Sequence, residues 1–230
     1  MPLVSHTELP TFQRLVGEGV EVLTPARAKN QDIRELHIGL LNMMPDAALQ
    51  ATERQFMRLV GACNRIAQFH VHPFTVRGIV REGAAKAYMD TYYASFEEIA
   101  EAGLDALIIT GANPLEDDIT KETFWDGMRE AMDWARENVC STLMSCLASH
   151  AAFKLYYGME RVGQAEKIWG VYPHQVSDRS HPMVSTVNTR FPAPHSRWND
   201  VPSQTMRAAG LRVLVENDDV GCFLASSGDG

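Results

Sequence analysis

The stretch LMSCLASHAA, residues 143 to 152, places a cysteine between an apolar run and a set of small residues. Cys146 ends a predicted strand at the centre of the predicted sheet, and the small residues after it begin a helix. A tight turn at this point would expose the sulfur, favour its thiolate at a helix N-terminus and direct backbone N–H groups at a developing oxyanion. This is the nucleophile elbow applied to a thiol. Free cysteine is also among the most buried residue types, so an inert core thiol is the alternative.

A nucleophilic thiol needs a general base, and the candidates are histidines. His150 follows Cys146 closely on the same predicted helix, which is poor geometry for a partner. His174 in GVYPHQV and His195 in APHSR lie in a later segment, and each is either a base or a hydrogen-bonded structural residue. Arg197 could pair with a substrate carboxylate through its planar guanidinium, and an ordinary surface arginine is the alternative.

The elements that must position Cys146 are short apolar strands alternating with amphipathic helices. Strands are predicted at 35–44, 67–76, 104–114 and 140–146, and helices at 48–62, 95–103, 120–137 and 148–158. Phe56, Leu59 and Val60 form the predicted buried face of the first helix, and Ser95 with Glu98 forms a capping box. This alternation favours an α/β fold, a parallel sheet with helices on both faces, whose active sites lie beyond the carboxyl ends of the strands.

The last third of the chain has a different character. Residues 159–202 are rich in His, Pro and aromatic residues, and they are predicted either to line a site or to form a surface excursion. Residues 211–230 predict two strands joined by a turn at ENDDVG, followed by a second turn signal at SSGDG. Because no strand follows that signal, we expect the sequence to end inside a hairpin, as a single domain over 1–230 that lacks a C-terminal portion.

The composition restricts the class of protein and its partners. With 230 residues, 45% of them hydrophobic and 22% charged, the chain can bury one core. A net charge of −8 without a Lys/Arg cluster argues against nucleic acid. The four cysteines are too scattered for a disulfide framework or a zinc site, and no phosphate-loop motif is present, so no metal or bound cofactor is expected. Without a signal peptide or an apolar run near about 18 residues, we expect a cytoplasmic protein away from membranes.

Five motifs in register resemble one known family. They are LLNMMP, LDALIITGANP, DWARENVCSTLMSCLASHAA, KIWGVYPH and FPAPHSR, which follow the family's order over about residues 36–226. The family is that of the homoserine O-acyltransferases of the homoserine O-succinyltransferase type. Its fold is similar to class I glutamine amidotransferases, a flavodoxin-like parallel sheet with helices on both faces, which agrees with the alternation described above.

The resemblance implies an activity and assigns roles to residues. The family transfers an acyl group from succinyl-CoA or acetyl-CoA, as co-substrate, to the hydroxyl of L-homoserine through a cysteine acyl-thioester. This ping-pong reaction serves methionine biosynthesis, and members are commonly homodimers. By position, Cys146 is the nucleophile and the Leu147 amide an oxyanion donor. Lys167 and Ser196 match substrate-binding positions, and Arg197 lies beside them.

Four departures from the family pattern limit how far these roles can be assigned to this chain. The chain has PDAALQ in place of a PKK-like step, so the expected lysine is absent and Ala47 is the nearest equivalent. Leu115, next to Glu116, occupies the position that separates acetyl-CoA from succinyl-CoA users, normally Glu or Gly. Leu147-Ala148 replaces Trp-Gly. The family's general base and its glutamate lie in a GHPEYD-like motif that this sequence does not contain, so the sequence is either a piece of a longer protein or a divergent member.

These departures keep two further hypotheses open. The same acyl-thioester could serve another amino alcohol as acceptor, which PDAALQ and Leu115 would permit. A non-catalytic ligand-binding relative is the hypothesis from a different class, because both the lysine and the base are missing.

Overall fold

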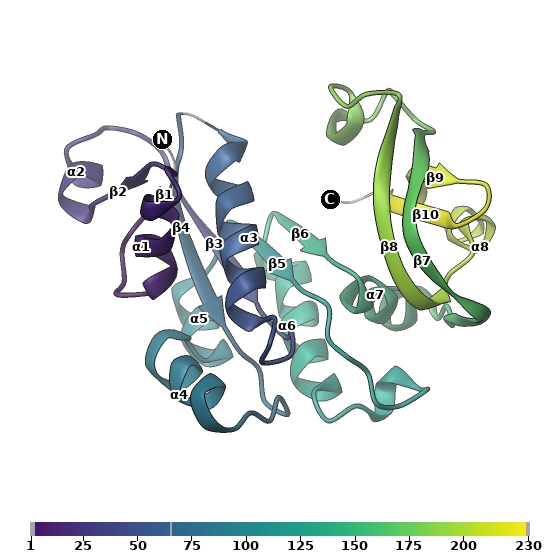
Figure 1. Cartoon of the computed structure of the whole chain (residues 1–230), viewed down its shortest axis with the longest axis horizontal. Coiled ribbons are helices and arrows are strands. Elements are labelled where there is room, and N and C mark those ends of the chain that lie inside the picture. Colours follow the sequence, from purple (N-terminus) through teal and green to yellow (C-terminus); the bar gives the residue numbers. More distant parts are fainter. Residues whose placement is uncertain (1–2, 65, 229–230) are drawn as a thin grey trace. The chain divides into compact units, whose positions relative to one another are not determined.

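The computed structural model describes residues 3–64 and 66–228. The chain divides into two compact units, Met1–Ser149 and His150–Gly230, and each contains a sheet of its own (Figure 1). The sequence predicted a single domain over residues 1–230, and whether these two units form one domain stays a prediction. Among the described helices, none is long and apolar enough to cross a membrane.

The first unit contains a six-stranded parallel sheet of order β2-β1-β4-β3-β5-β6. Its strands are β1 (Leu3–Val4), β2 (Val22–Leu23), β3 (Glu35–Leu41), β4 (Gln68–Phe74), β5 (Ala106–Ile109) and β6 (Ser141–Met144). The predicted parallel sheet is confirmed. The predicted central position of the cysteine's strand is wrong for the described residues, because β6 is an outer strand and the unpredicted β1 and β2 extend the opposite edge.

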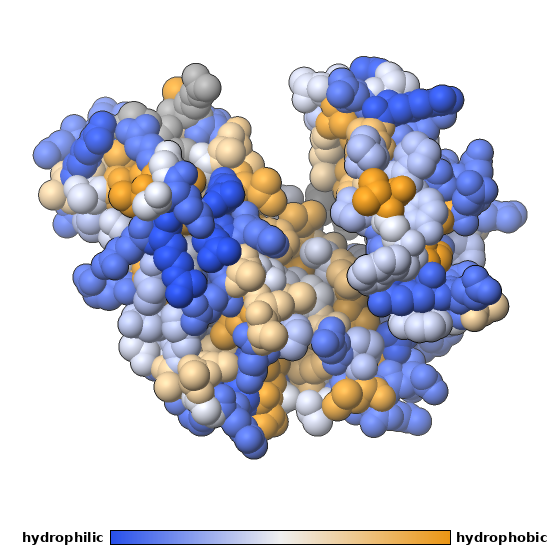
Figure 2. All heavy atoms as spheres, viewed as in Figure 1, coloured by the Kyte–Doolittle hydropathy of each residue, from blue (hydrophilic) through white to orange (hydrophobic). Residues whose placement is uncertain are grey.

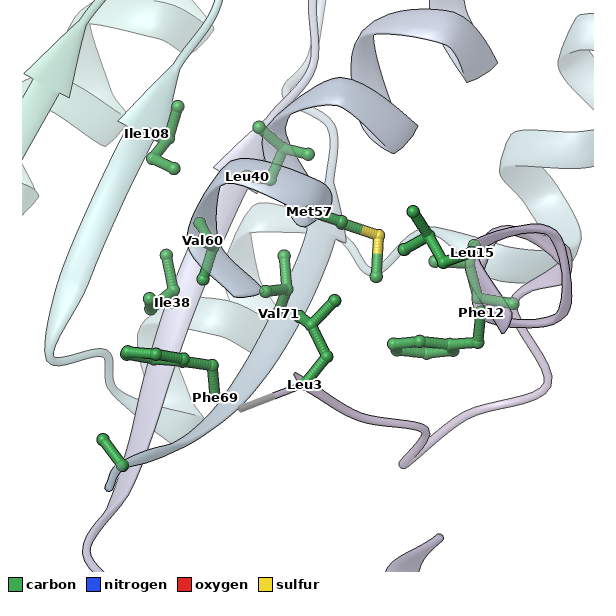
Figure 3. Packing of buried hydrophobic residues seen from close by; sticks show 12 residues of the cluster. Leu3, Phe12, Leu15, Ile38, Leu40, Met57, Val60, Phe69, Val71 and Ile108 are labelled. Carbon is green, nitrogen blue, oxygen red and sulfur yellow. The ribbon is translucent and has the colours of Figure 1, made fainter. Parts of the chain in front are cut away.

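Helices cover both faces of this sheet, as predicted. They are α1 (Pro10–Gly17), α2 (Pro25–Lys29), α3 (Leu49–Cys63), α4 (Gly83–Tyr92), α5 (Phe96–Ala102), α6 (Trp125–Asn138) and the short 3-10 helix η1 (Ile119–Lys121). On one face α1 and α3 contribute Leu15, Met57 and Val60 to a core with the strands (Figure 3). On the other face, the ring of Phe96 on α5 contacts Phe74 of β4 and Trp134 of α6.

The predicted helix at 48–62 corresponds closely to α3, but its buried face differs in part. Val60 is buried as predicted, whereas Leu59 is 62% exposed and Met57 is buried in its place. On the solvent side of α1 and α3, hydrophilic side chains gather (Figure 2), and Glu18 pairs there with Arg54 and Arg58. This arrangement makes α3 amphipathic with its apolar side toward the sheet.

The helix that precedes β5 begins and ends as its sequence predicts. The Ser95 side chain accepts from the Glu98 N–H and the Glu98 carboxylate accepts from the Ser95 N–H, which completes the capping box. Gly103 then ends α5 with a φ of 78°, a conformation that glycine adopts without steric cost.

The second unit contains a four-stranded antiparallel sheet of order β10-β9-β7-β8. Its elements are β7 (Val162–Val176), η2 (Pro182–Val184), β8 (Arg190–Asp200), α8 (Ser203–Ala208), β9 (Arg212–Asn217) and β10 (Gly221–Ser226), while α7 (Leu147–Tyr157) spans the boundary at 149/150. The predicted final strand pair is confirmed as β9 and β10. Residues 159–202, which showed few periodic runs, form the long β7–β8 ribbon instead of an irregular excursion.

Candidate functional site

Cys146 lies in the turn between β6 and α7 and is exposed. Among the described residues, it is the one non-glycine residue with a positive φ, 56°. A side chain in this left-handed region costs on the order of 1 kcal/mol, and such strain gathers at functional sites. The Cys146 carbonyl accepts from the Ser149 N–H (3.0 Å) and hydroxyl (2.6 Å), which begins α7. The predicted elbow geometry is therefore present, and Leu147, the first residue of α7, has an N–H without an acceptor inside the helix.

Gly111, two residues after β5, closely approaches the cysteine. A Cβ on Gly111 would lie 2.9 Å from the Cβ of Cys146 and 3.3 Å from its Sγ. Real side chains do not tolerate the shorter distance, so the contact requires glycine at this position. The residues around Gly111 in the sequence do not indicate this approach, because closeness to residue 146 is a long-range contact.

The loop after β3, which contains the NMMP motif, forms a hydrogen bond with Thr110, the residue before this glycine. The Met43 N–H donates to the Thr110 hydroxyl oxygen (2.9 Å), and that hydroxyl donates to the Gly111 carbonyl (3.0 Å). Thr110 is 1% exposed. The carboxyl ends of β3 and β5 are thus connected by hydrogen bonds next to Cys146, as expected for active sites of parallel sheets.

A buried hydrogen-bond network holds the beginning of the same loop. The Asn42 amide donates to the Tyr93 hydroxyl (3.0 Å), which donates to the Glu53 carboxylate (2.8 Å). Tyr88 (3.0 Å) and Thr11 also donate to that carboxylate, which is fully buried. Burial raises the pKa of Glu53, and hydrogen bonds from the three hydroxyls oppose the rise. Sequence patterns did not reveal this network, because its five members are distributed over four segments of the chain.

An arginine from another segment of the chain contacts the same loop, which the sequence did not lead us to expect. Ala47 stands where the family has a lysine, but the guanidinium of Arg81 reaches the loop from the segment after β4. Its Nη1 pairs with Asp46 and its Nη2 donates to the Met44 carbonyl, both at 2.5 Å, and the side chain is 6% exposed. The guanidinium of Arg81 therefore lies against this loop, where it is paired with the Asp46 carboxylate.

Leu115, the predicted position for acyl-donor choice, lies in the loop after β5. Its side chain is 92% exposed. The Leu115 and Glu116 N–H groups donate to one carboxylate oxygen of Glu122, at 2.6 Å and 2.7 Å. Glu122 is 7% exposed, so a buried carboxylate fixes the backbone of this loop while the Leu115 side chain points to solvent.

In the second unit, two of the predicted substrate-binding residues share one face of the sheet. Side chains alternate along β7 and β8, and Lys167 on β7 and Ser196 on β8 both lie on the exposed side. Trp169 pairs directly with Ser196 across the ladder. The Nζ of Lys167 lies 4.6 Å from the centroid of the Trp169 ring.

Arg197 belongs to the opposite face, and its guanidinium interacts with the protein itself. Nη1 donates to the Cys222 carbonyl (3.2 Å), Nη2 donates to the Val220 carbonyl, and Asp200 forms an ion pair at 3.3 Å. These contacts join β8 to the turn between β9 and β10. Substrate binding by Arg197 stays a prediction, and the contacts favour a structural role.

His174 and His195 also face the inner side, where they pair with each other. Their Nε2 atoms lie 3.0 Å apart, and His174 Nδ1 lies 2.9 Å from the Tyr172 carbonyl. Because a carbonyl can only accept, His174 carries its proton on Nδ1 and the Nε2 of His195 is the donor to His174. Burial, then the charges of Arg197 and His174, lower the pKa of His195 to about 4. This pairing favours the structural alternative for both histidines.

His150, the third candidate base, is neutral near pH 7. Burial, followed by the nearby charges of Arg161 and Arg197, lowers the pKa of His150 to about 4. The structure gives no hydrogen bond that would make it a partner of the cysteine among the described contacts.

Sequence reasoning missed a group of four histidines in the first unit, which comprises His6, His37, His70 and His72. His37 Nδ1 lies 2.9 Å from His72 Nε2, and the rings of His6 and His72 are 4.6 Å apart. Burial, then the charges of the other three, lower the pKa of His72 to about 3. Within residues 3–64 and 66–228, no group of three or more His, Cys, Asp or Glu side chains is arranged to hold a metal ion.

The parallel sheet defines a flavodoxin-like α/β protein, and the strained Cys146 lies in a turn at the carboxyl end of one of its strands. A solved structure from Thermoplasma acidophilum, described as that of a GMP synthase component, shares the fold with a TM-score of 0.52 and 11% identity over 86% of this chain and 80% of its own. The family model described as homoserine O-succinyltransferase matches residues 2–230, and the chain belongs to that family. The resemblance seen in the five motifs is confirmed.

Two curated relatives named homoserine O-succinyltransferase illustrate the similarity. The proteins from Methylobacter tundripaludum and Thiobacillus denitrificans are each 57% identical over 230 residues and align with the whole of this chain. The chain spans 65% and 66% of their lengths.

Proposed function

We propose that this protein is an acyl-CoA-dependent homoserine O-acyltransferase of methionine biosynthesis, acting in the cytoplasm. Succinyl-CoA is the proposed donor because the relatives are named succinyltransferases, and acetyl-CoA is the alternative. The observation that carries the proposal is Cys146, exposed and strained before α7 in a chain of this family.

The proposed reaction has two half-reactions at the cysteine sulfur. The Cys146 thiolate attacks the thioester carbonyl of the acyl-CoA, the carbonyl oxygen becomes an oxyanion near the Leu147 N–H, and the CoA thiolate leaves. The homoserine hydroxyl then loses its proton to a general base and attacks the acyl-thioester, which releases O-acylhomoserine and restores the thiolate. A donor directed at the developing oxyanion typically contributes about 10²–10³ in rate.

Binding of the acceptor is proposed for the exposed face of β7 and β8. The Lys167 ammonium suits the carboxylate of homoserine, and the Ser196 hydroxyl can orient the hydroxyl that reacts. Arg197 would support Ser196 by holding β8 to the β9–β10 turn, since both of its Nη atoms already donate to backbone carbonyls. Leu115 remains the proposed position for donor choice, and a homodimer is proposed from the family alone.

Intact-protein mass spectrometry tests the nucleophile. The protein is exposed briefly to succinyl-CoA or to acetyl-CoA, with Cys146→Ala as the matched control. A mass gain from one donor that depends on Cys146 would establish the thioester and identify the acyl group. The same measurement on a chimera that carries, after Gly230, the further residues of one of the longer relatives shows whether such residues are needed. If homoserine and acyl-CoA bind but neither chain acquires an adduct, the ligand-binding hypothesis replaces the enzyme.

The acceptor is tested separately. A screen of amino alcohols against the acylated protein measures CoA release at saturating donor. Homoserine should give the highest kcat/KM, because its carboxylate is the group that Lys167 would bind. A stronger response to an amino alcohol without a carboxylate would favour the alternative acceptor and contradict the proposed role of Lys167.

A further inference from the structure

Trp169 is an indole that the proposed reaction leaves unexplained. It is 68% exposed at the middle of β7, a position where a large aromatic side chain gains little from burial. It lies between the two proposed acceptor-binding residues: it pairs with Ser196 across the ladder, and the Lys167 ammonium is 4.6 Å from its ring centroid.

The contact with Lys167 has a clear physical consequence. A lysine side chain has a flexible four-carbon stem and loses considerable conformational entropy when its ammonium is held in one place. An indole is the best aromatic partner for a cation, and it attracts the ammonium to the face of the ring. Trp169 therefore reduces the freedom of the Lys167 ammonium before any substrate arrives.

We propose that Trp169 is a positioning residue for the acceptor amino acid. Its indole holds the Lys167 ammonium on the exposed face of β7 so that the ammonium meets the acceptor carboxylate while Ser196, on the adjacent strand, meets the hydroxyl. This inference rests on the proposed function, and it adds Trp169 to the residues on which acceptor binding depends.

Steady-state kinetics on the full-length protein test this role. Trp169→Leu should raise the KM for homoserine about two- to fivefold with little change in kcat, the factor that corresponds to ~0.5–1 kcal/mol for an exposed cation–π contact. Trp169→Phe, which keeps an aromatic face, should restore most of the loss. Trp198→Leu is the matched control, because Trp198 is a similarly exposed indole (57%) on β8. An equal rise in KM for Trp198→Leu would show a general effect of apolar surface and overturn the proposal.

A double-mutant cycle separates an effect through Lys167 from a direct one. In a Lys167→Met background, Trp169→Leu should have no further effect on KM. Additive effects of the two substitutions would overturn the proposal. Aminopropanol, the analogue of homoserine without its carboxylate, should respond equally to wild type and Trp169→Leu.

Nuclear magnetic resonance gives a readout that does not depend on turnover. The Cε protons of Lys167 should be shifted upfield by the ring current of Trp169, and Trp169→Leu should abolish the shift. Absence of the shift in the wild type would overturn the proposal. If the protein shows the shift but never acylates homoserine, the proposed function has failed, and the contact between the two side chains is established independently.

Discussion

Gly111→Ala should damage the cysteine turn through a steric contact. The added Cβ would lie 2.9 Å from Cys146 Cβ, at least 0.5 Å inside the 3.4 Å at which ordinary contact begins. Overpacking of this kind costs about 1–3 kcal/mol. Cys146 is already at a φ of 56°, so it has little freedom to rotate away. If a 1 Å misplacement of a reacting group costs about 10²-fold, half that distance predicts a loss of about tenfold in the rate of acylation.

The assay follows thioester formation by rapid mixing with succinyl-CoA and intact mass, beside urea unfolding. Gly17→Ala is the matched control, because a Cβ on Gly17, the last residue of α1, would meet nothing within 4 Å. That control should leave the rate of acylation unchanged and raise the free energy of unfolding by at most about 1 kcal/mol. Acylation of Gly111→Ala at the wild-type rate, with unchanged stability, would refute the close contact between residues 111 and 146.

Three further predictions concern stability. Glu53→Gln should lower the free energy of unfolding by about 1–3 kcal/mol, because the amide replaces one acceptor of the buried network by a donor; urea unfolding equal to wild type would contradict the network. His72 has a lowered pKa in the folded state, so its contribution to stability is present above its ordinary pKa of 6.5 and is lost as pH falls from 6.5 toward about 3. His72→Gln should therefore reduce the slope of stability against pH between 7 and 5 by up to about 1.4 kcal/mol per pH unit, and urea unfolding at several pH values measures that slope. Cys146→Gly should be more stable than Cys146→Ala by about 1 kcal/mol, because glycine adopts a φ of 56° without strain, although neither variant can form the thioester; equal unfolding curves would argue against the strained turn.

Local signals in the sequence were sufficient for much of the first unit. The hydrophobic period identified α3, the capping box identified α5, and the small residues after Cys146 identified the strand-to-helix turn, because each depends on neighbours a few residues apart. The five motifs identified the family for the same reason, since each is a continuous stretch of chain.

Features that depend on distant residues could not be predicted. Arg81 reaches the Met44 carbonyl across 37 positions, and nothing near either residue indicates the contact. The β7–β8 ribbon escaped notice because prolines such as Pro173 and Pro192, which pair with each other across the ladder, are residues that usually argue against a strand. The pairing of His174 with His195 requires that ribbon, so it could not be foreseen without it.

The alternation of side chains along β8 means that substitutions at neighbouring positions of the APHSR motif should have different effects. His195 and Arg197 make contacts inside the second unit, whereas Ser196 between them faces solvent. In a saturation library read separately for cellular abundance and for growth without methionine, changes at 195 and 197 should deplete both signals. Changes at 196 should spare abundance. Under the proposed function, acceptor preference would then be open to laboratory evolution on the exposed face, while the inner face is kept unchanged for stability.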